Sequence, residues 1–112
     1  MTMNEFEQQY LGEIYLLKFP FSDGKNYKKR PILVILDTGD NDMVVCRITS
    51  KIYNTEFDFK IEDWKESGLK LPSIIRLHKI ATLEKDLIDK KLGQINEELK
   101  QQIKEKFKHM VG

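Results

Sequence analysis

A cluster of basic side chains around one aromatic residue is the clearest chemical signal in this sequence. Lys25, Lys28, Lys29 and Arg30 surround Tyr27. Cations follow the phosphates of a single-stranded nucleic acid, and an aromatic ring can stack on an unpaired base. A solvated surface loop can have the same composition. The cluster therefore predicts either a nucleic-acid site or an ordinary exposed loop.

Arg30 is the most informative member of this cluster because it directly precedes Pro31. The proline ring restricts the residue before it to extended geometry, so Arg30 is expected to be held in place. A guanidinium can bind a phosphate through two parallel hydrogen bonds and neutralise charge in the transition state. Thr49 and Ser50 end the following strand, where hydroxyl groups either donate to a phosphate oxygen or cap the strand end.

Arg76 and His78 form a second polar pair, two residues apart on an expected strand and therefore on one of its faces. A histidine can exchange a proton near neutral pH, which makes His78 a candidate acid or base. A surface histidine, or one satisfied by hydrogen bonds, is the commoner alternative. Arg76 can contact substrate if its strand ends near the basic cluster.

The composition narrows the classes of site that are possible. The chain has 19 Lys and Arg residues and 18 Asp and Glu residues, so its net charge is +1. A nucleic-acid-binding surface would therefore have to be a local basic patch. No zinc-ligand spacing or glycine-rich nucleotide motif is present, so we expect no metal and no cofactor. The single cysteine, Cys46, lies in an apolar run and is expected in the core.

No apolar stretch approaches the roughly 20 residues that span a bilayer, and no targeting segment opens the chain. We therefore expect a cytoplasmic protein without membrane contact.

The elements that must position these residues are mostly short strands. The pattern predicts strands over 13–19, 31–36, 43–49, 57–61, 73–80 and 91–95, with a loop over 20–27. Residues 62–67 are expected to form one helical turn that ends at Gly68. Thr82 is expected to cap a short helix over 83–88.

The C-terminal segment is predicted to be a helix capped by Asn96. Its apolar residues recur every four positions, at Ile95, Leu99, Ile103 and Phe107, and form a stripe that packs on a sheet or on a partner. Several short strands and one closing helix indicate a compact, strongly bent antiparallel sheet.

An ordered set of short motifs resembles the PemK/MazF toxins of type II toxin-antitoxin systems. The first half of the set is Gly12-Glu13-Ile14-Tyr15, Phe19-Pro20-Phe21-Ser22-Asp23-Gly24 and Arg30-Pro31-Ile32-Leu33-Val34-Ile35. The second half is Ile48-Thr49-Ser50, Ser73-Ile74-Ile75-Arg76-Leu77, Ile80-Ala81-Thr82-Leu83 and Leu92-Gly93-Gln94-Ile95. The resemblance covers almost the whole chain, which is expected to be one domain over residues 1–112 with an N-terminal extension over 1–10.

The resemblance implies a mainly β fold, an SH3-like barrel of about six antiparallel strands with short helices and a C-terminal helix. It also implies a homodimer that cleaves single-stranded RNA without metal, by attack of the ribose 2′-hydroxyl on the adjacent phosphate. The products would carry a 2′,3′-cyclic phosphate and a 5′-hydroxyl. An acidic, partly disordered antitoxin is the implied protein partner.

The same resemblance assigns roles to individual residues. Arg30 matches the catalytic arginine of the family and Thr49 its phosphate-contacting hydroxyl. His78 occupies the position of a family acidic residue and is taken here as the third catalytic candidate. The substrate-binding candidates are Lys25, Tyr27, Lys29, Ser50 and Arg76.

Three positions depart from the family pattern, namely His78, Ala81 and Lys25. Two other functions therefore stay open at this point. One is a toxin that resembles CcdB and grips DNA gyrase without catalysis, and the other is an RNA-binding SH3-like module that has lost activity.

Overall fold

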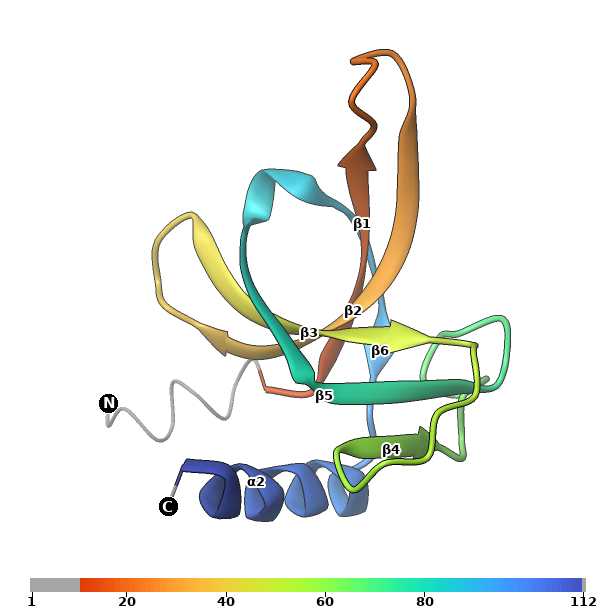
Figure 1. Ribbon diagram of the computed structural model, residues 1–112, viewed down its shortest axis with the longest axis vertical. Coiled ribbons are helices and arrows are strands. Elements are labelled where there is room, and N and C mark those ends of the chain that lie inside the picture. The colour runs from red at the N-terminus through yellow and green to blue at the C-terminus, as the bar shows by residue number, and fades with distance from the viewer. Residues whose placement is uncertain (1–10, 112) are drawn as a thin grey trace.

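The computed structural model describes residues 11–111, and the expected N-terminal extension over 1–10 lies outside them. Within residues 11–111, six strands form one antiparallel sheet in the order β4-β5-β3-β2-β1-β6, and an α-helix follows the last strand (Figure 1). The strands are β1 (Glu13–Pro20), β2 (Tyr27–Asp37), β3 (Asp42–Thr49), β4 (Asp58–Ile61), β5 (Ser73–Glu84) and β6 (Ile88–Gln94). A 3₁₀ turn, η1 (Lys85–Leu87), joins β5 to β6, and helix α2 (Glu97–Val111) closes the chain. The prediction of a mainly β protein with six antiparallel strands and a C-terminal helix is confirmed.

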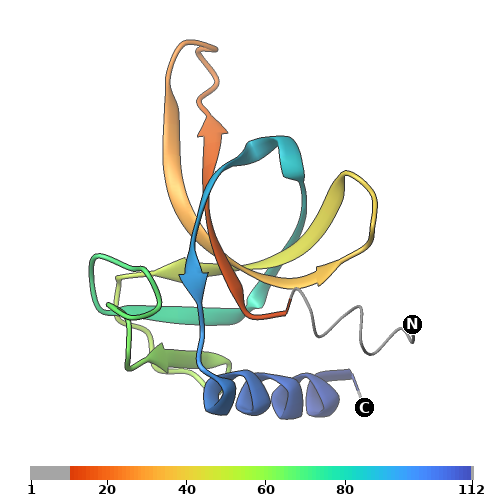
Figure 2. The ribbon, with the colours of Figure 1, turned by 180° about the vertical axis from the view of Figure 1, so that it is seen from behind.

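An interruption of the ladder between β3 and β5 bends the sheet. Arg47 pairs with Arg76, but its neighbour Cys46 pairs with Ile80, so the β5 residues between them have no ladder partner on β3. Extra residues on one strand bend it and increase the local twist. Figure 2 shows the result, a sheet that curls round until the segment from β5 through η1 to β6 arches over its open side.

Apolar side chains pack on both faces of β2, which explains its continuous apolar run. Leu33 belongs to a core cluster that includes Leu99 and Ile103 of α2. Ile32 and Val34 belong to a second cluster on the other face. Successive residues of a strand point to opposite faces, so a strand buried on both sides has to be apolar throughout.

Helix α2 begins at its predicted cap and packs through its predicted stripe. The Asn96 side-chain oxygen accepts the N–H of Leu99 at 2.7 Å. Leu99 and Ile103 are buried, and Phe107 packs against the same cluster. Of the residues described, 11–111, no helix is long and apolar enough to cross a membrane.

The prediction of a short helix after Thr82 is wrong. Thr82 pairs with Val44 and Leu83 pairs with Met43, so β5 continues to Glu84 and only η1 follows it. Leu83 also packs on the second core cluster. The ladder hydrogen bonds and this burial outweigh the capping preference of one threonine, since intrinsic propensity is a weak influence beside tertiary contacts.

The expected loop over 20–27 is shorter than predicted. β2 begins at Tyr27, which pairs with Pro20, and Lys29 pairs with Lys18. The basic cluster is therefore divided between a turn, which carries Lys25, and a strand, which carries the rest. Strand pairing holds the strand residues at fixed positions, which a loop would not do.

Candidate functional site

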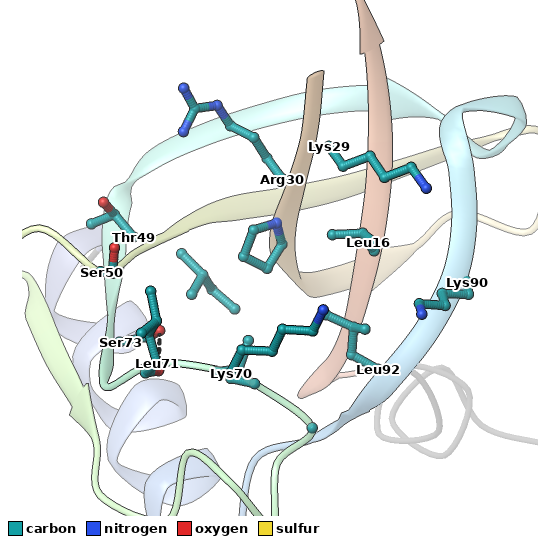
Figure 3. A pocket seen from close by; sticks show the side chains of 14 residues that line it. Leu16, Lys29, Arg30, Thr49, Ser50, Lys70, Leu71, Ser73, Lys90 and Leu92 are labelled. Atoms are coloured by element: carbon teal, nitrogen blue, oxygen red, sulfur yellow. Dashed lines mark hydrogen bonds between the residues drawn. The ribbon is translucent and has the colours of Figure 1, made fainter. Parts of the chain in front are cut away.

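A pocket of about 410 Å³ opens near the beginning of β2 and the end of β3, beside β1, β6 and the connection between β4 and β5 (Figure 3). Its floor is largely apolar, and its polar side chains are basic or hydroxyl-bearing. The lining residues are Leu16, Lys29, Arg30, Pro31, Ile48, Thr49, Ser50, Gly68, Leu69, Lys70, Leu71, Ser73, Lys90 and Leu92. None of these side chains is acidic, so the pocket favours an anionic ligand.

Arg30 and Thr49 line this pocket from adjacent strands. The β2–β3 ladder ends at the pair of Ile32 and Arg47, and Arg30 and Thr49 each lie two residues beyond that pair. Figure 3 shows Arg30, Thr49 and Ser50 together on one side of the pocket. The sequence-predicted arginine and hydroxyls are thus brought to one place.

Arg30 and Thr49 are both able to donate hydrogen bonds to a ligand in the pocket. Within residues 11–111, Arg30 makes no ion pair, and its side chain is half-buried. The Thr49 Oγ1 atom accepts the backbone N–H of Lys51 at 3.2 Å. Because this oxygen acts as the acceptor there, its hydroxyl proton remains available to a ligand.

Lys29 reaches the pocket from β2 and is held by an acidic residue of β6. Its Nζ lies 3.1 Å from Asp89 Oδ2, and Lys18 Nζ lies 3.5 Å from Asp89 Oδ1. The hydrogen bond from Lys29, together with the charges of Lys29 and Lys18, holds the pKa of Asp89 below its ordinary value. Lys18 and Lys29 also lie 4.9 Å and 6.0 Å from the ring centre of exposed Tyr27. Tyr27 therefore lies beside Lys29, near the pocket, without lining it.

Lys25 lies outside the pocket lining, in the turn between β1 and β2. The Asp23 carboxylate accepts the N–H groups of Lys25 and Asn26 at 3.0 and 3.1 Å. These hydrogen bonds lower the pKa of Asp23, and the one from the Lys25 N–H has the largest effect. The turn is ordered by its own hydrogen bonds and presents the lysine to solvent.

Arg76 is committed to an internal ion pair away from the pocket lining. Its Nε lies 2.9 Å from Asp58 Oδ1, and its guanidinium lies 3.5 Å from the ring centre of Tyr53. Burial raises the pKa of Asp58, but hydrogen bonds from Thr55 and Arg76 outweigh it and bring that pKa below its ordinary value. This arrangement ties the segment between β3 and β4 to β5.

His78 lies outside the pocket lining as well. Its ring packs against Phe57, with the ring centres 5.5 Å apart. Its Nδ1 atom is buried and has no hydrogen-bond partner among residues 11–111. Arg76 and His78 thus both contact the segment between β3 and β4, and neither of them lines the pocket beside Arg30.

Cys46 is in the core, as expected. It is fully buried, and burial raises the pKa of its thiol to about 12. The thiol therefore stays protonated at neutral pH and is a poor nucleophile. Elsewhere among residues 11–111, no three His, Cys, Asp or Glu side chains come together as a possible metal site.

The pocket wall opposite Arg30 comes from the connection between β4 and β5, which no sequence motif indicated. Residues 62–67 make turns that end at Gly68, whose φ is +92°. The N–H of Leu69 bonds to the carbonyl of Trp64 at 2.9 Å, and that of Gly68 bonds to Lys65 at 3.0 Å. This pair of bonds is a Schellman motif, so the predicted glycine termination is confirmed.

Two glycines then let this connection pack directly against β6. A Cβ atom on Gly68 would lie 1.9 Å from the Leu92 carbonyl oxygen, and one on Gly93 would lie 2.3 Å from that of Ser67. The contact brings the connection, with Lys70 and Leu71, and β6, with Lys90 and Leu92, into the lining of one pocket. No sequence spacing indicates this meeting, because it depends on the path of the chain between β4 and β5.

Arg30 and Pro31 also border a second pocket, of about 370 Å³, on the side of β3 and β5. Arg47 and Lys79 are its other charged residues, and the remainder of its lining is apolar. Arg30 therefore stands between two hollows of the surface.

A strongly bent antiparallel sheet with one closing helix and a basic pocket at its strand ends defines a small SH3-like barrel. A family model for the PemK-like, MazF-like toxin of type II toxin-antitoxin systems matches residues 10–111. The chain belongs to this family, as the ordered motifs predicted. Among curated proteins, no relative matches the sequence.

Solved structures of such toxins share the fold. A mycobacterial endoribonuclease in complex with its cognate antitoxin is similar with a TM-score of 0.66 at 18% identity, over 84% of this chain and 85% of that one. The MazE-MazF structure from Deinococcus radiodurans has a TM-score of 0.65 at 16% identity, over 88% and 91%. The Mycobacterium tuberculosis toxin MazF-mt6 has a TM-score of 0.63 at 15% identity, over 81% and 89%.

Proposed function

We propose that this chain is an endoribonuclease that cleaves single-stranded RNA, chiefly mRNA, at particular sequences, as the toxin of a type II toxin-antitoxin pair. Its family membership supports the toxin role. The observation that carries the catalytic part is the convergence of Arg30 and Thr49 in a basic pocket without acidic side chains. Such a pocket attracts a phosphate and offers donors to it.

In the proposed reaction the scissile phosphate binds at Arg30, whose guanidinium donates to the non-bridging oxygens. The Thr49 hydroxyl donates a further hydrogen bond. The ribose 2′-oxygen attacks the phosphorus atom and loses its proton to solvent, and the bond to the 5′-oxygen breaks as that oxygen takes a proton from solvent. The products carry a 2′,3′-cyclic phosphate and a 5′-hydroxyl.

Catalysis in this scheme rests mainly on electrostatics. Charge builds on the phosphate oxygens in the pentacovalent transition state, and fixed donors stabilise it more than they stabilise the ground state. No carboxylate or imidazole lines the pocket within residues 11–111, so we assign the 2′-hydroxyl proton to solvent and not to His78. The scheme uses no metal ion.

The other candidate residues divide by position. Lys29 and Ser50 line the pocket and are proposed to contact the RNA beside the cleaved bond. Tyr27 and Lys25 are exposed on the approach to it and can stack on a base or attract the backbone. Arg76 is proposed to act through the fold, because its donors already meet Asp58.

The proposed setting follows the family. The chain acts as a single domain and as a homodimer in the cytoplasm, and an acidic antitoxin blocks the RNA site. Two of the similar structures hold a toxin together with an antitoxin, which supports that partner. A basic pocket with an apolar floor suits an acidic chain that folds as it binds.

The decisive experiment is cleavage of a long single-stranded RNA by the purified chain in excess EDTA, with the product ends mapped. Discrete cuts that bear 2′,3′-cyclic phosphates are expected, with activity at least about a hundredfold lower in Arg30→Ala. Lys60→Ala is the matched control, because Lys60 is exposed on β4 and does not line the pocket. RNA that binds but stays intact would reject the enzyme and leave an RNA-binding module; no binding at all would make gyrase inhibition the next assay.

A further inference from the structure

Two lysines from distant parts of the chain, Lys70 and Lys90, line the same pocket. Leu16 on β1 pairs with Lys90 on β6, so these side chains are neighbours across the ladder. Lys70 comes from the connection between β4 and β5, which packs on β6. Figure 3 shows Lys70 and Lys90 in the lining of this pocket, with Leu92 between them and with Thr49 and Ser50 on the other side.

Neither lysine is neutralised by the protein. Both are exposed, and within residues 11–111 neither makes an ion pair. Lys29 differs, because Asp89 holds it at 3.1 Å. Two like charges that point into the same space repel one another, and a bound anion would relieve that repulsion.

The backbone that carries these lysines is held rigidly. The Schellman motif at Gly68 and the close approach of Gly68 and Gly93 fix the connection against β6. The Ser73 hydroxyl donates to the Leu71 carbonyl at 2.8 Å and so closes the next turn. A ligand that binds here meets a preformed wall and pays little to order it.

Apolar side chains accompany this lysine pair in the lining of the pocket. Leu16 and Leu92 line the pocket, and Leu71 is 58% exposed at its edge. An exposed leucine beside unpaired cations suits a nucleotide, because the base can lie on apolar surface while the phosphate meets the charges. A simple inorganic anion would use the lysines alone.

We propose that Lys70 and Lys90 bind a second backbone phosphate of the RNA, one nucleotide away from the scissile phosphate at Arg30. The nucleotide between the two phosphates rests on Leu16, Leu71 and Leu92. The pocket thus sets the register of the strand and contributes to the choice of cut site. This inference rests on the proposed ribonuclease function.

The test compares Lys70→Ala/Lys90→Ala with the charge-matched control Lys60→Ala/Lys108→Ala, whose residues are exposed and do not line the pocket. Binding is measured over a range of salt concentrations, with an RNA that carries a 2′-deoxynucleotide at the mapped cut and so cannot react. The Lys70/Lys90 variant should bind at least about tenfold more weakly. The slope of log affinity against log salt should fall by about 0.7, the value for one phosphate of a single strand.

Kinetics on cleavable RNA add a second readout. The pocket variant should have a raised KM and nearly unchanged kcat, because it loses binding that ground and transition states share. Lys70→Arg/Lys90→Arg should restore the affinity. An unchanged salt slope in Lys70→Ala/Lys90→Ala would overturn the proposed phosphate subsite. Cleavage by the unmodified chain would in that case still support the ribonuclease function. Absence of cleavage by the unmodified chain would reject both.

Discussion

The guanidinium of Arg76 lies 2.9 Å, through its Nε, from Oδ1 of Asp58, and this ion pair is nearly closed to solvent, with side-chain exposures of 10% and 2%. The pair joins β5 to the first residue of β4, and Tyr53 stacks on the same guanidinium. Arg76, which the sequence suggested for substrate binding, is therefore held in an internal ion pair.

We predict that Arg76→Met lowers the free energy of unfolding by about 3 kcal/mol, because it leaves the Asp58 carboxylate buried without its partner. Urea unfolding measures this loss. The double variant Arg76→Met/Asp58→Asn should lose less than the sum of the two single variants. A stable Arg76→Met protein that no longer binds RNA would instead place Arg76 in the substrate site.

The same pair gives a pH dependence with a definite sign. The pKa of Asp58 in the folded protein is below its ordinary value of 3.8, since hydrogen bonds from Thr55 and Arg76 outweigh burial. The stability that the carboxylate contributes is therefore complete above that ordinary value and is lost as the pH falls through the folded pKa. Unfolding curves between about pH 5 and pH 2 should show the gap between the unmodified chain and Asp58→Asn shrinking toward the acid end.

Gly68→Ala and Gly93→Ala should each destabilise the protein by about 2 to 4 kcal/mol, because the new methyl group would lie 1.9 Å and 2.3 Å from backbone oxygens. Thermal unfolding tests this. Gly24→Ala is the control for Gly68, since Gly24 shares the positive φ but has nothing within 4 Å of its added Cβ. It should cost only about 1 to 2 kcal/mol. Equal losses at Gly24 and Gly68 would mean that backbone conformation, and not close packing, is the constraint.

Asn96→Ala should cost about 1 kcal/mol, because it removes the acceptor for the N–H of Leu99. The loss should appear in the unfolding free energy and leave the rate of cleavage per folded molecule unchanged. Asn96→Asp keeps the acceptor and should keep the stability.

His78→Gln should retain RNA cleavage, because His78 packs on Phe57 outside the pocket lining. The measurement is kcat/KM as a function of pH beside that of the unmodified chain. A loss of about a hundredfold or more, with one limb of the pH profile removed, would show that His78 does transfer a proton.

Local sequence features determined much of the fold. The alternating and continuous apolar runs located all six strands, and the four-residue stripe with Asn96 located the helix. They succeeded because side-chain periodicity and capping act over a few residues. The one false element, the helix after Thr82, failed because pairing with β3 outweighed a local preference.

Part of the candidate site could also be predicted from the sequence. Arg30 before Pro31 and the hydroxyls at the end of β3 were each predicted to bind a phosphate, and the structure puts Arg30, Thr49 and Ser50 in one pocket. An antiparallel hairpin aligns its two strands in a regular register, so residues at equal distance from the turn meet across it.

What the sequence by itself determined about this protein is its family, its strands and helix, and the arginine and hydroxyls of one hairpin. Only the tertiary structure decided that Asp58 holds Arg76, that Asp89 holds Lys29, and that Lys70 and Lys90 share a wall of the pocket. These relationships join residues far apart in the chain, and their strength depends on burial and on distances of a few ångströms. The burial of these residues and the distances between them are set only when the sheet curls and the connection between β4 and β5 packs against β6.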